Sequence, residues 1–130
     1  MGQQQLLLIV LGALIVGLAI YGGTRFVAAF NQENERDLII QQMSVLAGEA
    51  RKFAARPRYM GGGEGSFEGF SPPARMAETD RVTINVTSGA DWVLFQGYGS
   101  VVGIDGSSPV LVVGQYELSS ETWSTLETVN

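Results

Sequence analysis

Residues 6–30 read LLLIVLGALIVGLAIYGGTRFVAAF, and this stretch decides how the rest of the chain is organised. From residue 6 to residue 20 there is no polar side chain, and the first charged residue is Arg25. A helix rises about 1.5 Å per residue, so about 20 apolar residues span the hydrocarbon core of a bilayer. The stretch therefore predicts a helix that crosses a membrane or is buried in something equally apolar.

The composition excludes several classes of function. The 130 residues leave room for this helix and one small domain, and they include no histidine and no cysteine. The commonest general base, thiolate nucleophiles and Cys/His zinc sites are therefore absent from the chain. A net charge of −5 argues against nucleic acid as a partner. We expect no enzymatic activity, no cofactor and no metal, and we attribute Asp105-Gly106-Ser107 to a turn rather than to weak calcium binding.

An amphipathic segment follows the apolar one. Residues 31–37 (NQENERD) are polar and predict a solvated stretch that remains helical. Apolar residues then recur every three or four positions, which predicts one buried face, and Pro57 ends the pattern. These residues are Ile39, Met43, Leu46, Ala50, Phe53 and Ala54. We therefore predict a single helix from about Gln3 to Ala55, with Gly22-Gly23 as a point of helix flexibility or, alternatively, of close helix packing.

Residues 58–77 are rich in glycine and proline and predict a connecting loop. The glycines at 61–65 are not followed by the Gly-Lys-Ser/Thr of a phosphate-binding loop. We expect a flexible connector in which Phe67 and Phe70 are surface aromatics that hold the loop against a neighbouring surface.

From residue 81 onward the pattern is that of β-strands. Residues 82–87 alternate between apolar and polar, residues 92–96 form a second strand, and Gly97-Tyr98-Gly99 predicts a bend or bulge. Asp105-Gly106 predicts a turn, and 110–118 is the strongest strand signal. For 121–129 we favour an edge strand over a short helical turn begun by Ser124 and Glu127. The fold class is α+β, with the amphipathic half-helix covering one face of about four antiparallel strands.

Four regions follow from these patterns. They are the apolar half-helix (1–30), the amphipathic half-helix (31–56), the loop (57–80) and the β head (81–130). Within the head, Asn85-Val86-Thr87 fits the N-glycosylation triplet, and Asn85 is a glycosylation candidate if its face of the strand is exposed to solvent.

This order of elements resembles the type IV pilins, in which an apolar helix anchors the subunit in a membrane and then packs with its copies in an extracellular filament. The resemblance implies processing between Gly2 and Gln3 by a prepilin-type peptidase, and an inner-membrane location before assembly. Many pilins carry a glutamate at the fifth mature position, where this chain has Leu7. We expect the amides of Gln3, Gln4 and Gln5 to register the subunits instead, since unpaired polar groups are costly in an apolar core.

The filament interpretation predicts a homo-oligomer assembled through the N-terminal apolar helix. Arg25 should then pair with Glu33, Glu35 or Asp37 of a neighbouring copy. The alternative is a single-pass membrane protein with a small β interaction module. Arg25 and Arg36 follow the apolar stretch, so the positive-inside tendency favours a cytoplasmic head unless a basic leader precedes it. Adhesion, motility, DNA uptake and secretion all remain open. The expected assembly residues are Gln3, Gln4, Gln5, Leu6, Leu7, Ile9, Val10, Leu14, Leu18, Tyr21, Arg25, Phe26 and Phe30.

Overall fold

The structure is a computed structural model that describes residues 2–129. One helix, α1 (Gly2–Ala55), begins the chain and confirms the predicted helix to within a residue. By its internal packing the chain divides into two compact units, Met1–Asn31 and Gln32–Asn130. The first unit is helical throughout its described residues, and the second contains the rest of α1 and all of the strands.

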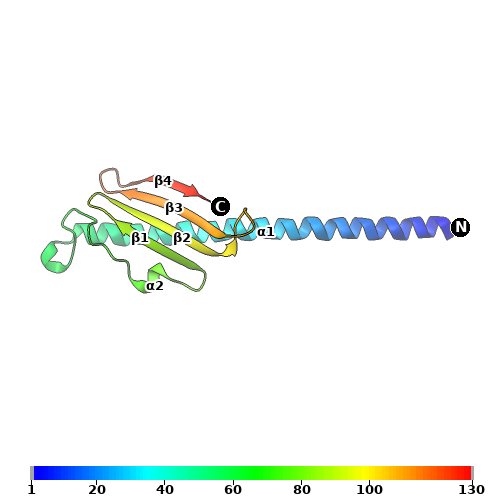
Figure 1. Cartoon of the computed structure of the whole chain (residues 1–130), viewed down its shortest axis with the longest axis horizontal. Coiled ribbons are helices and arrows are strands. Elements are labelled where there is room, and N and C mark those ends of the chain that lie inside the picture. The colour runs from blue at the N-terminus through cyan, green and yellow to red at the C-terminus, as the bar shows by residue number, and fades with distance from the viewer. Residues whose placement is uncertain (1, 130) are drawn as a thin grey trace. The chain divides into compact units, whose positions relative to one another are not determined.

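Four antiparallel strands form the sheet of the second unit (Figure 1). They are β1 (Val82–Ser88), β2 (Trp92–Val102), β3 (Pro109–Glu117) and β4 (Thr122–Thr128), paired in chain order as a meander. The α+β fold class is confirmed. The last segment is an edge strand as we favoured, and the helical turn at Ser124 is not formed.

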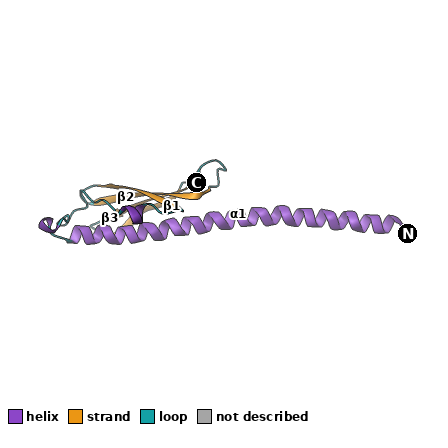
Figure 2. Ribbon diagram, turned by 90° about the horizontal axis from the view of Figure 1, so that it is seen from below, coloured by secondary structure: helices purple, strands orange, loops and turns teal. Residues whose placement is uncertain are grey.

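Residues 32–55 of α1 lie along one face of this sheet (Figure 2). The helix supplies one regularly spaced buried row, and the inward-facing residues of β1, β2 and β3 supply the opposite side. Phe95 is fully buried and packs against the ring of Trp123, with 5.7 Å between ring centroids. The buried row of the helix consists of Glu35, Ile39, Met43, Leu46, Ala47, Ala50 and Ala54.

The glycines of β2 allow this close packing. A Cβ atom on Gly97 would overlap Cγ2 of Ile39, and one on Gly99 would lie 2.6 Å from Cγ of Glu35. The predicted bend or bulge at 97–99 is confirmed in part: β2 runs on to Val102 without a break, but its register with β3 shifts between Tyr98 and Val102, so an irregularity begins within the predicted stretch. The glycines are required by the approaching helix rather than by a break in the strand.

The loop between helix and sheet is more structured than the sequence indicated. It contains a short 3-10 helix, η1 (Arg58–Met60), and a single helical turn, α2 (Ala74–Ala77). Its glycines cap α1, because the N–H groups of Gly63 and Gly65 donate to the carbonyls of Phe53 and Ala54 at 2.9 and 2.7 Å. These carbonyls have no partner within the helix itself.

Phe67 and Phe70 belong to the core and are not surface residues. Phe67 is fully buried, and its ring meets that of Tyr116 edge-on at 6.3 Å. Phe70 is also buried and packs on Phe53 at 5.6 Å. The two rings do hold the loop against its neighbours, as predicted. The expectation that they are surface residues was wrong, because glycine and proline content gives no information on where the aromatic side chains between them point.

Candidate assembly surface

The first unit presents an apolar surface on all sides of the helix. Every described residue from Gly2 to Asn31 is exposed. An 18-residue window of α1 has a mean hydropathy of 2.5 and none of it is buried, so the helix is long and apolar enough to cross a membrane. Large apolar side chains exposed by more than half include Leu6, Leu7, Leu8, Ile9, Val10, Leu14, Ile15, Val16, Leu18, Ile20, Tyr21, Phe26, Val27 and Phe30.

All thirteen predicted assembly residues lie on this surface. Gln3, Gln4 and Gln5 occupy the first helical turns and are exposed. The structure brings two of the thirteen together: the guanidinium of Arg25 lies 5.5 Å from the centroid of the Tyr21 ring, and its Nη2 donates to the Tyr21 hydroxyl at 3.4 Å. Among the described residues Arg25 makes no ion pair with a carboxylate, and the Tyr21 ring is the partner of its guanidinium.

Helix α1 remains regular through Gly22 and Gly23. Neither glycine has a neighbouring atom within 4 Å of the position a Cβ would take, and the same holds for Gly12 and Gly17. The packing interpretation therefore requires another helix, and the flexibility interpretation stays a prediction. Thr24, the next residue, donates its hydroxyl to the Tyr21 carbonyl at 2.9 Å, a bond that often accompanies helix bending.

Glu35 corrects the expectation that residues 31–37 are solvated. Its side chain is completely buried, and Oε1 accepts hydrogen bonds from the Ser100 N–H at 2.7 Å and the Ser100 hydroxyl at 2.8 Å. Oε2 lies 3.5 Å from Nη2 of Arg81. Glu35 is therefore not available to Arg25 of another copy, whereas Glu33 and Asp37 are exposed.

A signal for this burial does exist in the sequence. Glu35 lies four residues before Ile39 and eight before Met43, so it continues the apolar row of the helix by one turn. Buried charges are stable only when paired and hydrogen-bonded. Its two partners, Ser100 in β2 and Arg81 just before β1, are 65 and 46 residues away, which is why the pattern around Glu35 alone did not reveal them.

Asn85 lies on β1 with its side chain exposed, and Thr87 is exposed on the same face of the strand. Its neighbours along β1, Ile84 and Val86, face the core, so the Asn85 amide stands on the face of the sheet opposite the helix. The triplet thus meets the condition of solvent exposure that its assignment as a glycosylation candidate required.

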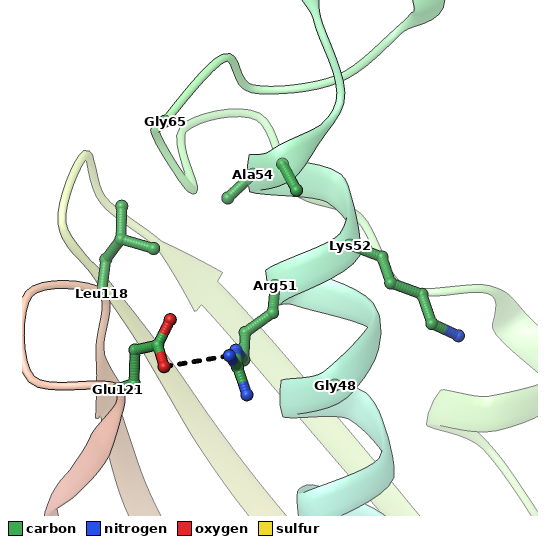
Figure 3. Close-up of a pocket in the computed structure, with 8 residues that line it drawn as sticks. Gly48, Arg51, Lys52, Ala54, Gly65, Leu118 and Glu121 are labelled. Carbon is green, nitrogen blue, oxygen red and sulfur yellow. Dashed lines mark ion pairs between the residues drawn. The ribbon is translucent and has the colours of Figure 1, made fainter.

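A pocket lies between the end of α1 and the β3–β4 connection (Figure 3). Its two facing charges neutralise each other, because Arg51 Nη2 and Glu121 Oε2 are 3.0 Å apart. Lys52 points away from Leu118 and Glu121 in Figure 3 and pairs with Glu49 at 2.7 Å. Both cations of this pocket are therefore ion-paired, and among residues 2–129 no three His, Cys, Asp or Glu side chains are grouped to hold a metal ion.

No protein-family model matches the chain, and no curated protein or solved structure matches it either. The pilin-like architecture is therefore defined by the chain's own elements, a long apolar N-terminal helix whose later part packs on a small antiparallel sheet.

Proposed function

We propose that the chain is a structural subunit of an extracellular, type IV pilus-like helical filament, and that it polymerises through its N-terminal apolar helix. One observation carries the proposal: residues 6–20 bear no polar side chain, and all of them are exposed. Burying apolar surface away from water is favourable by about 25 cal/mol for each Å² buried. A helix exposed around its whole circumference needs cover on every side.

Identical copies supply that cover in a simple geometry. Each helix in a parallel bundle is surrounded by others, and one contact repeated by a fixed rotation and rise gives an open filament rather than a closed ring. Because position 7 is leucine, the amides of Gln3, Gln4 and Gln5 register neighbouring chains in this proposal. Arg25 leaves its Tyr21 ring for Glu33 or Asp37 of a neighbour.

The proposal includes maturation between Gly2 and Gln3 by a prepilin-type peptidase, with the subunit held in the inner membrane until it is assembled. The role is structural and needs neither a cofactor nor catalysis. N-terminal sequencing of the assembled chain tests the cleavage, since the expected mature sequence begins at Gln3. An N-terminus at Met1 or beyond Leu6 would remove the processing step from the proposal.

The second candidate is a single-pass membrane protein whose sheet is an interaction module. It is favoured by the same window of mean hydropathy 2.5, which matches one bilayer crossing without any partner helix. The two candidates share the membrane-inserted stage and differ in the final state of the helix. In the filament it touches sister helices, and in the anchored protein it touches lipid.

Electron microscopy of material sheared from cells distinguishes these states. We expect thin fibres that contain this chain by mass spectrometry and that are missing from cells lacking the gene. Chain recovered only as detergent-soluble monomer from the membrane fraction, with no fibres, would replace the filament by the membrane-anchored module.

A further inference from the structure

Two connections of the second unit each present a pair of exposed apolar side chains, and we call these pairs the helix-end tip and the hairpin tip. The helix-end tip consists of Tyr59 and Met60 in η1, which are 83% and 64% exposed. The hairpin tip consists of Val102 and Ile104 at the β2–β3 connection, which are 47% and 83% exposed. Single exposed apolar residues are normal on protein surfaces, but these are paired at the ends of two projecting connections.

The two tips lie at opposite ends of the second unit. η1 follows directly on the last turn of α1, whereas the hairpin tip is tied to the other end of this helical segment, because Gln32 Nε2 donates to the Val102 carbonyl at 3.0 Å. Residues 32–55 of a helix span about 35 Å. Figure 1 shows the same separation, with the β2–β3 turn and the loop after α1 at opposite ends of the sheet.

Both tips are held in shape by their own hydrogen bonds. Gly61, at a φ of 76°, ends η1 and donates to the Arg58 carbonyl at 3.0 Å. At the hairpin, Gly103 donates to the Ser108 carbonyl at 2.8 Å, and Asp105 accepts bonds from the Ser107 and Ser108 N–H groups, both at 3.1 Å. The apolar side chains of both tips therefore project from ordered turns, and none of them is part of the hydrophobic core.

The charges beside the tips are opposite in sign. Arg56 and Arg58 flank the helix-end tip, where Arg58 is 3.7 Å from Glu64 and Arg56 makes no ion pair within residues 2–129. Asp105 is next to Ile104 at the hairpin tip. Bonds from the Ser108 hydroxyl and from the Ser107 and Ser108 N–H groups lower the pKa of Asp105 to about 2, so the carboxylate is charged at neutral pH.

We propose that the helix-end tip of one copy packs against the hairpin tip of the next copy along the filament. The contact joins Tyr59 and Met60 to Val102 and Ile104, with Arg56 facing Asp105. In a bundle of parallel helices all copies share one polarity, so the two ends of the unit meet only in this head-to-tail sense. Such a contact uses two different surfaces, so between copies of one polarity it repeats along the filament and does not close in a dimer. The inference rests on the proposed filament function and adds a second, outer layer of contacts to it.

The absence of cysteine from the chain allows a direct test. Full-length Tyr59→Cys/Ile104→Cys is assembled into filaments and treated with a short bismaleimide, and the products are separated on a denaturing gel. Each copy then offers one thiol to each neighbour, so we expect a ladder of trimers and longer chains. Tyr59→Cys alone and Ile104→Cys alone should give at most dimers. Tyr59→Cys/Asn85→Cys, which pairs the tip with an exposed strand residue, is the matched control and should give no ladder.

The outcomes separate this inference from the proposed function. Fibres that give no ladder with Tyr59→Cys/Ile104→Cys overturn the contact between tips and leave the filament intact. An equal ladder from the Asn85 control also overturns it, because the linking would then be non-specific. If the wild-type chain forms no fibres, both proposals fail. A ladder specific to the 59/104 pair supports the contact.

Discussion

Glu35 is the single charged side chain completely buried among residues 2–129, and its three contacts, two with Ser100 and one with Arg81, join the helix to β2 and to the residue before β1. Removing the carboxylate in Glu35→Ala leaves Ser100 without its acceptor and opens a cavity beneath the sheet. We expect a loss of about 1–3 kcal/mol in the free energy of unfolding. Trp92 and Trp123 fluorescence during urea denaturation in mild detergent measures the loss.

Glu35→Gln provides the sharper comparison, because its amide oxygen can still accept both bonds from Ser100. The loss should be clearly smaller than for Glu35→Ala. Glu33→Ala, two residues away and exposed, should change the unfolding free energy by no more than about 0.5 kcal/mol. Equal effects of Glu35→Ala and Glu33→Ala would show that the Ser100 contacts do not stabilise the fold.

Gly97 tests how closely the helix approaches the sheet. A methyl group in Gly97→Ala meets Cγ2 of Ile39, so we expect a loss of about 1–3 kcal/mol in the free energy of unfolding. Gly48→Ala is the control and should raise the free energy of unfolding. Nothing lies within 4 Å of its Cβ position, and alanine is more favourable than glycine in a helix interior by about 1 kcal/mol. In Gly97→Ala/Ile39→Ala the two losses should be less than additive. Full additivity would place the strand and the helix further apart than we describe.

Asn85 makes a prediction about covalent modification. Asn85 and Thr87 are exposed on the same face of β1, so a transferase can reach both. In a source that performs N-glycosylation, the intact chain should be heavier by one glycan. Asn85→Gln and Thr87→Ala should both lose this mass, whereas Thr87→Ser, which retains the triplet, should keep it. An unmodified mass for the native chain would remove Asn85 from the candidate sites.

At the scale of elements, Gly22-Gly23 makes α1 locally less stable if the flexibility interpretation holds. Each glycine costs about 1 kcal/mol relative to alanine, and the pair lies beside the Thr24 hydroxyl bond to Tyr21. Amide hydrogen exchange of the detergent-bound chain should be faster at residues 22–26 than in the turns of α1 on either side of them. Gly22→Ala/Gly23→Ala should slow it there, while Gly12→Ala should leave it unchanged. Uniform exchange along the wild-type helix would favour close packing as the reason for these glycines.

The elements were largely predictable because their signals are local. The apolar run, the three- to four-residue spacing up to Ala54 and the alternation in 82–87 each lie within one element. What the sequence concealed depends on long-range contacts. Glu35 is buried with Ser100 as its hydrogen-bond partner, and Phe67 is buried against Tyr116. Gly97 is needed because Ile39 of the helix occupies the space that a side chain would take. The apolar character of the first unit is plain from its composition, but no local pattern says what covers it.

At the scale of the whole molecule, the two units should respond differently to a charge in the first one. Leu14 is 58% exposed in the middle of the apolar stretch and belongs to the unit formed by Met1–Asn31. In Leu14→Asp a carboxylate would have to be buried among sister helices, and an unpaired buried charge is very costly. We expect fibres to disappear while the tryptophan fluorescence and the urea midpoint of the head stay unchanged.

Leu14→Ala keeps the position apolar and should still assemble, so it controls for loss of shape alone. A failure of membrane insertion would also abolish fibres, because a single aspartate at the centre of a spanning helix costs about 2.5–3.5 kcal/mol on insertion scales. The membrane fraction of Leu14→Asp cells must therefore be measured together with the fibres. Normal membrane levels without fibres would locate the defect in helix packing. Normal fibres from Leu14→Asp would mean that residue 14 faces water or a cation in the assembled state, and helix-driven polymerisation would have to be abandoned.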